Sequence, residues 1–380
     1  MRLGAWLPFR SAAAVLADFT GIAVDEATVR RRTEAAGAAY AAVQAAEVAA
    51  LEAAAPEPPA GPPLQLVSVD GAMVPLVGGA WAEVKTLAVG TIQPPVIARG
   101  EPVVHTTALS YFSRRAEASA FTRLALVETH RRGVATAGRV AGVADGAEWC
   151  QGFLDEHRPD AARILDFPHA AEYVAEAGRA AGGDAAEPAW LAAQLRELRH
   201  GDPDRVLGAL RALGDGLADR PAALDAVATS VRYLAARRGQ IAYAAFAAAG
   251  LPCGSGSVES ANKLVVEARM KGGGMRWAPA HVDPMLALRN AVCNDRWAEA
   301  WPQIAAALRA AAHRRARRDR AARQVPVATA PPALAPVAAP PPPARPAPPR
   351  RRDAAPAAPR RPAATHPWRR YGHALNPQVA

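Results

Sequence analysis

Residues 64–71 read LQLVSVDG, a short apolar run that ends on one acid and a glycine. Its β-branched residues, among them Val67 and Val69, predict a buried strand. An acid at the C-terminal end of a buried strand, here Asp70, points into the crevice where open α/β sheets bind ligands and metals. The simpler alternative is a turn, because Asp-Gly often only ends a strand. The dipeptide alone favours the turn, and the rest of the chain changes that balance.

The chain has 380 residues, enough for two or three domains, and its many alanines predict a largely helical protein. The formal charge of +10 suggests an anionic partner. Residues 314–380 hold 14 Arg and 2 Asp, a net +12, so the first 313 residues sum to −2 when +12 is subtracted from +10. The basic excess belongs to the tail, and the globular part must bind any anion through local arrangement.

The three cysteines, Cys150, Cys253 and Cys293, lie far apart and form no CxxC pair. This spacing indicates neither a zinc site nor a disulfide framework. No stretch approaches 18 apolar residues without a charge, so no membrane span is expected. Residues 1–14 contain no apolar segment followed by a cleavage site, and the expected location is therefore the cytoplasm.

Residues 1–58 form a predicted helical N-terminal region, with a turn at Gly21 and an acidic start to the next helix at Asp25. The pattern is compatible with half of a helix-turn-helix in which residues 30–32, all arginine, face DNA. It is also compatible with an ordinary helical hairpin, which we slightly favour. The Pro-rich residues 55–63 read as a linker.

The middle of the chain alternates strand and helix patterns in the order β-β-β-α-β-α-β. Helices are expected at residues 116–132 and 147–157. The expected strands are residues 64–70, 81–92, 103–112, 139–144 and 161–167. The fourth strand, like the first, ends on an acid and a glycine, Asp145 and Gly146. The predicted class is therefore α/β, with a mixed sheet over residues 64–170.

Residues 171–250 show only alanine-rich helical patterns and predict an all-α insertion, broken at 182–183, 201–203 and 220–221. Residues 251–300 contain a Gly/Ser turn, a helix for which Ser257 is the expected N-cap, and the end of the core. The expected apolar face of that helix is Val258, Ala261, Leu264, Val265 and Ala268. The expected polar face is Glu259, Lys263, Glu267 and Lys271. Residues 301–325 predict a basic helix, and the Pro/Ala/Arg residues 326–380 a disordered tail that binds DNA without sequence choice.

Three acids stand out in this order: Asp70, Asp145 and Glu259. A meander followed by a helical crossover places strands one and four side by side and parallel. Carboxylates at the matching ends of strands about 4.8 Å apart can share a divalent ion, and a third carboxylate can hold a second ion. Two such ions stabilise the attacking and leaving oxygens of phosphoryl transfer. Carboxylates this close repel each other, so a cation is expected among them.

An ordered set of motifs gives the chain a family resemblance. The motifs are VSVDGAMVPL (67–76), EVKTLAVG (83–90), VADGAEW (143–149), ILDFPHAAEY (164–173), GSGSVESANKLVVEARMKGGGMRW (254–277) and PMLALRNAVCNDRW (284–297). With these motifs the chain resembles bacterial insertion-sequence DDE transposases of the ISKra type, within the mutator-like group. The resemblance implies an RNase H-like fold, two Mg²⁺ or Mn²⁺ ions, a nucleoid-associated location, and a homodimer or higher assembly on the element's terminal repeats and target DNA.

The resemblance also implies roles for single residues. Asp70, Asp145 and Glu259 match the catalytic, metal-binding triad. Asp166 and His169 match a D-x-x-H element beside the active site, and a rival assignment makes Asp166 the second triad acid. The residues expected along the DNA are Asn262, Lys263, Arg269, Lys271, Arg276 and Trp277; each is as compatible with a surface role, and Trp277 also with a core role.

Relatives of this kind have a longer N-terminal region with cysteine pairs that helps to bind the element ends, and this chain lacks the pairs. Two other functions therefore remain open. One is a truncated or domesticated copy that acts only as a DNA-binding protein. The other is an RNase H-fold nuclease that is not a transposase. The intact acids favour an enzyme, and the helical insertion favours a transposase over another nuclease.

Overall fold

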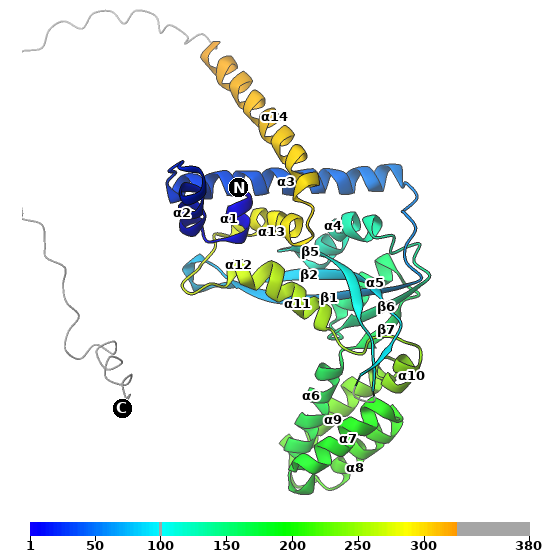
Figure 1. The fold of residues 1–380 in the computed structure, drawn as a ribbon. Coiled ribbons are helices and arrows are strands. Elements are labelled where there is room, and N and C mark those ends of the chain that lie inside the picture. Colours follow the sequence, from blue (N-terminus) through cyan, green and yellow to red (C-terminus); the bar gives the residue numbers. More distant parts are fainter. Residues whose placement is uncertain (99–100, 325–380) are drawn as a thin grey trace, which may run out of the picture. The chain divides into compact units, whose positions relative to one another are not determined.

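The computed structural model describes residues 1–98 and 101–324. Contacts group Met1–Arg323 into one compact unit, and the description concerns this unit (Figure 1). It is an α/β protein, mostly helical, with a mixed five-stranded sheet. Residues 326–380, the expected disordered tail, lie outside the described residues. Within the described part, no helix is long and apolar enough to cross a membrane.

The sheet has the strand order β5-β2-β1-β6-β7. β1 (Leu64–Pro75), β2 (Trp81–Ile92) and β5 (Thr106–Arg114) form an antiparallel meander. β6 (Arg139–Ala144) then lies parallel to β1, and β7 (Ala162–Leu165) lies parallel to β6. The predicted mixed sheet is confirmed, and so is the prediction that the first and fourth strands are parallel neighbours. A separate two-stranded ribbon, β3 (Val96–Ala98) and β4 (Glu101–Val103), extends the link between β2 and β5.

Helices cover one face of the sheet where the chain crosses from β5 to β6 and on to β7. α4 (Ala118–Arg131) and α5 (Glu148–His157) are amphipathic, and they bury Phe121 and Phe153 against Val69 and its neighbours. The aromatic rings of Phe121 and Phe153 pack with centroids 5.8 Å apart. This crossover determines that β6 runs parallel to β1 and ends at the same edge of the sheet.

The other face is covered by one helical stretch in three parts: α11 (Gly256–Ala261), the π-helical segment η4 (Asn262–Glu267) and α12 (Ala268–Met270). α13 (Pro279–Cys293) adds to this layer. The predicted N-cap is wrong: the residue at the N-cap position of α11 is Ser255, two residues before Ser257.

The predicted apolar face of this stretch is correct only in its first turns. Val258, Ala261 and Val265 are fully buried, but Leu264 is 38% exposed and Ala268 is exposed. A π-helix bonds each residue to the fifth along the chain, so each turn holds more residues than in an α-helix. The buried face is therefore displaced by one residue, and Val266, Arg269 and Met270 take the inner positions.

The N-terminal region is helical, as predicted: α1 (Arg2–Trp6), α2 (Phe9–Thr20) and α3 (Glu26–Ala54). Gly21 ends α2 in the left-handed conformation, and the Asp25 carboxylate accepts a 2.6 Å hydrogen bond from the Thr28 amide to cap α3. The two helices pack as a hairpin, and α3 also lies along α13. α14 (Trp297–Gln324) contains the predicted basic helix.

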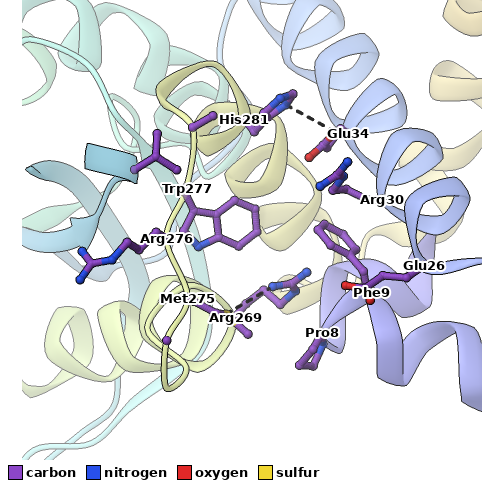
Figure 2. Close-up of a pocket in the computed structure, with 13 residues that line it drawn as sticks. Pro8, Phe9, Glu26, Arg30, Glu34, Arg269, Met275, Arg276, Trp277 and His281 are labelled. Carbon is purple, nitrogen blue, oxygen red and sulfur yellow. Dashed lines mark hydrogen bonds and ion pairs between the residues drawn. The ribbon is translucent and has the colours of Figure 1, made fainter. Parts of the chain in front are cut away.

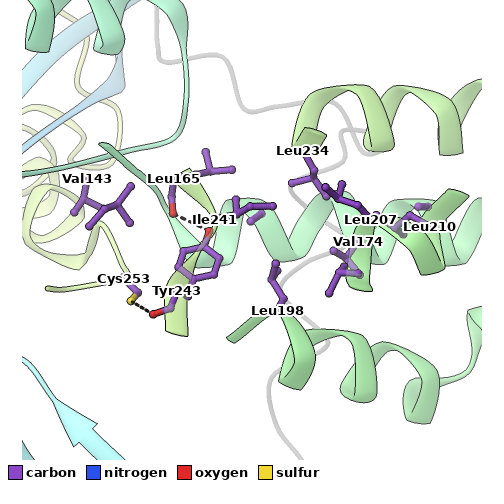
Figure 3. Close-up of a cluster of buried hydrophobic side chains, with 14 of the residues drawn as sticks. Val143, Leu165, Val174, Leu198, Leu207, Leu210, Leu234, Ile241, Tyr243 and Cys253 are labelled. Atoms are coloured by element: carbon purple, nitrogen blue, oxygen red, sulfur yellow. Dashed lines mark hydrogen bonds between the residues drawn. The ribbon is translucent and has the colours of Figure 1, made fainter. Parts of the chain in front are cut away.

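Residues 170–250 contain no strand, as predicted, and form an all-helical insertion between β7 and α11 (Figure 1). α6 ends at the predicted break at 182–183, α7 ends at the break at 201–203, and α9 begins at the break at 220–221. They are α6 (Phe167–Ala181), α7 (Pro188–His200), α8 (Pro203–Asp215), α9 (Pro221–Ala236) and α10 (Tyr243–Ala248). Figure 3 shows the fully buried side chains that join them, including Val174, Leu198 and Leu234. Tyr243 ties the cluster to the sheet, because its hydroxyl donates a 2.8 Å hydrogen bond to the Leu165 carbonyl.

Candidate functional site

Asp70 lies within β1 and not at its end, which corrects the predicted strand boundary. The parallel pairing of β1 with β6 stops at Ser68 and Val143, while its antiparallel pairing with β2 continues to Pro75. The turn alternative for Asp70-Gly71 is therefore wrong. Beyond Ser68, β1 has a strand partner only on its β2 side, and the Asp70 carboxylate faces η4, where it accepts a hydrogen bond from the Asn262 side chain.

Asp145 and Asp166 follow directly after β6 and β7, whose last residues, Ala144 and Leu165, are paired. Ser68 pairs with Val143, so Asp70 and Asp145 occupy corresponding positions two residues further on. The three aspartates thus come from three neighbouring parallel strands at one edge of the sheet.

The carboxylate of Asp70 is half-buried and lines an open pocket, and each of its oxygens accepts one hydrogen bond. Oδ1 accepts a 2.7 Å hydrogen bond from the Gly71 amide, and Oδ2 accepts a 2.8 Å bond from the Asn262 side-chain amide. Burial raises the pKa of Asp70, and the negative charges of Asp145 and Glu259 raise it further, against the two hydrogen bonds. Asp70 therefore lies within the electrostatic field of the two acids that are expected to act with it.

Glu259 projects from the first turn of α11 and is exposed. The Ser255 hydroxyl donates a 3.0 Å hydrogen bond to its Oε1 atom. Glu259 and Asp70 both line an open pocket of about 250 Å³, together with Asn262, Lys263 and the Glu267–Lys271 ion pair. Carboxylates facing an open pocket are the oxygen donors that Mg²⁺ prefers. In residues 1–98 and 101–324, no three His, Cys, Asp or Glu side chains already converge closely enough to hold one metal ion.

Asp145 is half-buried in the turn between β6 and α5. Its Oδ1 accepts a 2.9 Å hydrogen bond from the Ala147 amide and a 3.5 Å contact from the Cys150 thiol. Burial, followed by the charge of Asp145, raises the pKa of Cys150, which keeps this thiol neutral. The backbone carbonyl of Asp145 accepts a 2.9 Å hydrogen bond from the Tyr233 hydroxyl of α9.

Asp166 is 6% exposed, and both of its carboxylate oxygens are used within the protein. Oδ2 accepts the His169 amide at 3.3 Å and caps α6, while Oδ1 accepts the Ser255 amide at 2.7 Å. The fifth predicted strand accordingly ends before Asp166. His169 lies half-buried on α6, 3.7 Å from the Glu172 carboxylate and edge-on to the Tyr173 ring. Asp145 is less buried than Asp166, and its Oδ2 accepts no hydrogen bond from the described residues, so Asp145 has more room for another ligand.

The residues expected along DNA divide into two groups. Lys263 and Arg276 are exposed, and Lys271 is half-buried with its ammonium 2.6 Å from Glu267. Asn262 is 6% exposed, and its amide is directed at Asp70. Lys263 and Lys271 therefore border the pocket beside Asp70 and Glu259, whereas Asn262 belongs to its floor.

Arg269 and Trp277 lie in the protein interior, which corrects their expected place along DNA. Arg269 is 2% exposed; its guanidinium donates to the Gly4 carbonyl and lies over the rings of Phe9 and Trp277, 4.7 and 5.1 Å from their centroids. Burial, with the nearby charge of Arg289, lowers the pKa of Arg269 to about 10. Trp277 is 6% exposed, so its core alternative holds.

Figure 2 shows these side chains at a second pocket of about 540 Å³, between the loop after α12 and the start of α2 and α3. Arg30 lines it beside Glu34, which pairs with His281 at 3.6 Å. Arg30 therefore faces a pocket of this chain in addition to being exposed to solvent.

The π-helical phase shift explains the inward turn of Arg269, and no local pattern in the sequence predicts such a shift.

Sequence reasoning missed three residues that hold the candidate acids: Ser255, Tyr233 and Arg237. Ser255 stood in a motif already singled out, but its contact with Asp166 joins residues 89 positions apart. Tyr233 and Arg237 looked like ordinary residues of an alanine-rich helix. Their partners, the carbonyls of Asp145 and Gly146, lie 88 and 91 positions away, so no local signal could identify them.

Comparison with known proteins does not identify a family for this arrangement. No protein-family model matches the chain, and no curated protein matches its sequence. Function must therefore be argued from the residues and their geometry.

Proposed function

We propose that the protein is a DDE transposase with an RNase H-like catalytic core, which cleaves and joins DNA strands with Mg²⁺. The observation that carries the proposal is the placement of Asp70 and Asp145 at corresponding positions of β1 and β6, with Glu259 close enough that both charges raise the pKa of Asp70. Structural acids are seldom gathered so that neighbouring charges oppose the ionisation of one of them, whereas metal-binding acids are.

The arrangement of the core supports the proposal. The three-stranded meander, the crossover helix and the parallel fourth strand are the elements that the RNase H-like resemblance requires. The helical insertion lies between the second and third acids of the proposed triad, as expected for the mutator-like group. DNA is the proposed partner, bound as a homodimer or a larger assembly.

The residues that would hold Mg²⁺ are Asp70, Asp145 and Glu259, with Asp166 left in its role as cap of α6. Bound metal would supply charge stabilisation for the pentacoordinate phosphate and activation of the attacking oxygen. The protein contributes orientation: Asn262 fixes Asp70, and Ser255 fixes Glu259. Lys263 at the pocket border would meet the phosphate backbone of the bound strand.

The test is incubation of the purified chain with the DNA ends of its element, target DNA and Mg²⁺, scored for cleaved and joined products. We expect Asp70→Asn, Asp145→Asn and Glu259→Gln each to abolish both products while DNA affinity remains nearly unchanged. Glu267→Gln is the matched control, because it removes a carboxylate from the same pocket that is already paired with Lys271.

The other functions appear as distinct outcomes. Binding by the wild-type chain without cleavage would indicate a DNA-binding protein only. Cleavage without joining would indicate a nuclease. An Asp145→Asn enzyme that keeps cleaving beside an inactive Asp166→Asn enzyme would transfer the triad position to Asp166.

A further inference from the structure

The helical insertion contacts the turn that carries Asp145. The Tyr233 hydroxyl of α9 donates to the Asp145 carbonyl at 2.9 Å. The guanidinium of Arg237, the residue directly after α9, donates to the Gly146 carbonyl at 2.9 Å. The Tyr233 ring stacks on Tyr173 of α6 with centroids 3.9 Å apart, and Arg237 covers its other side at 3.7 Å. Two helices of the insertion therefore fix the backbone of this turn.

The turn is fitted closely to these side chains. Gly146 has a φ of +80°, a conformation that other residues rarely adopt. A Cβ atom at this position would also lie 2.6 Å from the Tyr233 hydroxyl oxygen and 2.9 Å from Nε of Arg237. The chain thus has a glycine where α9 lies against the turn that carries Asp145.

A separate set of hydrogen bonds joins the insertion to Glu259. Asp166 caps α6, the first helix of the insertion, and its other oxygen accepts the Ser255 amide. The Phe167 amide, also at the start of α6, donates to the Cys253 carbonyl at 3.0 Å. Ser255 in turn holds Glu259 through its hydroxyl. Any displacement of α6 would therefore be transmitted to this carboxylate.

The insertion can act as one body because its helices share a dry core. Val174 of α6, Leu198 of α7 and Leu234 of α9 are fully buried in a single cluster (Figure 3). Closely packed interiors transmit displacement because they have few voids in which to absorb it. Movement of α9 at Asp145 and movement of α6 at Glu259 are thus linked.

We propose that the helical insertion is a positioning module for the metal-binding acids. Tyr233 sets Asp145, and Asp166 with Ser255 sets Glu259, so that the insertion determines the spacing of two of the three carboxylates. Tyr233, Asp166 and Ser255 are positioning residues in this arrangement. The inference rests on the proposed function, because it assumes that these acids bind divalent ions.

The test measures Mn²⁺ affinity of the full chain without DNA, by electron paramagnetic resonance of the free ion, together with the melting temperature. Tyr233→Phe removes one hydroxyl and keeps the stacked ring. Its matched control is Tyr173→Phe, since the Tyr173 hydroxyl makes no hydrogen bond among the described residues. Ser255→Ala removes the bond to Glu259, Ser257→Ala in the first turn of α11 is its control, and Ser255→Thr restores a hydroxyl.

Removal of a residue that orients a metal ligand typically weakens metal binding about 10- to 100-fold. We therefore expect Tyr233→Phe and Ser255→Ala each to weaken Mn²⁺ binding by about tenfold or more. Both controls should keep wild-type affinity, Ser255→Thr should recover most of it, and the melting temperatures should remain close together.

The outcomes separate this inference from the proposed function. If Asp70→Asn binds Mn²⁺ as well as the wild type, the metal site itself is refuted. If Asp70→Asn loses binding but Tyr233→Phe and Ser255→Ala retain it, only the positioning role is refuted. Equal losses in the Tyr173→Phe and Ser257→Ala controls would also refute it, because the effect would then not depend on the contacts with the acids.

Discussion

Gly37 marks the closest approach between the N-terminal helices and the core, and its replacement tests that packing. A Cβ atom on Gly37 of α3 would lie 2.0 Å from the carbonyl oxygen of Pro284 in α13. Ordinary contact begins at 3.4 Å, so the two helix backbones would have to separate by about 1.4 Å. The obstacle is backbone, which cannot rotate away as a side chain can. The separation would open the buried cluster around Ala36, Tyr40 and Leu288.

Overpacking of a core typically costs about 1–3 kcal/mol, and the helix propensity of alanine offsets up to about 1 kcal/mol. We expect Gly37→Ala to lower the free energy of unfolding by about 2 kcal/mol, since a backbone clash this short lies at the costly end of that range. Gly208→Ala in α8 is the control, because no atom of another described residue lies within 4 Å of its added Cβ. It should stabilise the protein by about 0.5–1 kcal/mol.

Urea titrations followed by circular dichroism measure both free energies. Equal stability of Gly37→Ala and Gly208→Ala would mean that α3 and α13 are not in close contact at this position.

Three further predictions follow from charge. Arg296→Met leaves the Glu128 carboxylate buried without its bidentate partner and should cost about 3–5 kcal/mol, whereas Arg10→Met at an exposed pair should cost under about 1 kcal/mol in the same urea titration. The pKa of Asp70 is raised in the folded state, so its contribution to stability is present below about pH 4 and is lost as pH rises through the raised value. In metal-free buffer, the free energy of unfolding of Asp70→Asn should therefore rise relative to that of the wild type from about pH 4 to 7, and a pH-independent difference would contradict this. Deletion of residues 326–380 removes eight Arg and one Asp; if half of those arginines contact phosphates, the slope of log K against log salt on random duplex should become shallower by roughly 3–4, and equal slopes would place the DNA-binding charge on the core.

The sheet and the helical insertion could be predicted because their signals are local. Short runs of apolar and β-branched residues indicated the strands, and the glycine and proline breaks divided the insertion. The adjacency of β1 and β6 followed from the order of elements and the handedness of crossovers, with no knowledge of side-chain contacts. These features placed Asp70 and Asp145 at one edge of the sheet.

The remainder depends on contacts between distant residues or on small changes in helix geometry. One π-helical segment moved Arg269 from an expected phosphate contact to the interior, and it moved Leu264 to the surface. Asp166 has the spacing of a candidate catalytic acid, yet its partners occupy both oxygens, and one of them, Ser255, comes from beyond the insertion. Periodicity describes which face of an element is apolar, but it contains no information on which polar group lies opposite.

The central claim is that Asp70, Asp145 and Glu259 bind divalent metal together. Replacing Mg²⁺ by Fe²⁺ in the presence of ascorbate and peroxide produces hydroxyl radicals at the bound metal, which cut the nearby backbone. Mapping of the fragments should show cuts near residues 70, 145 and 259, and Asp70→Asn should abolish all three. Cuts at only one of these positions, at other positions, or unchanged in Asp70→Asn would contradict the shared site.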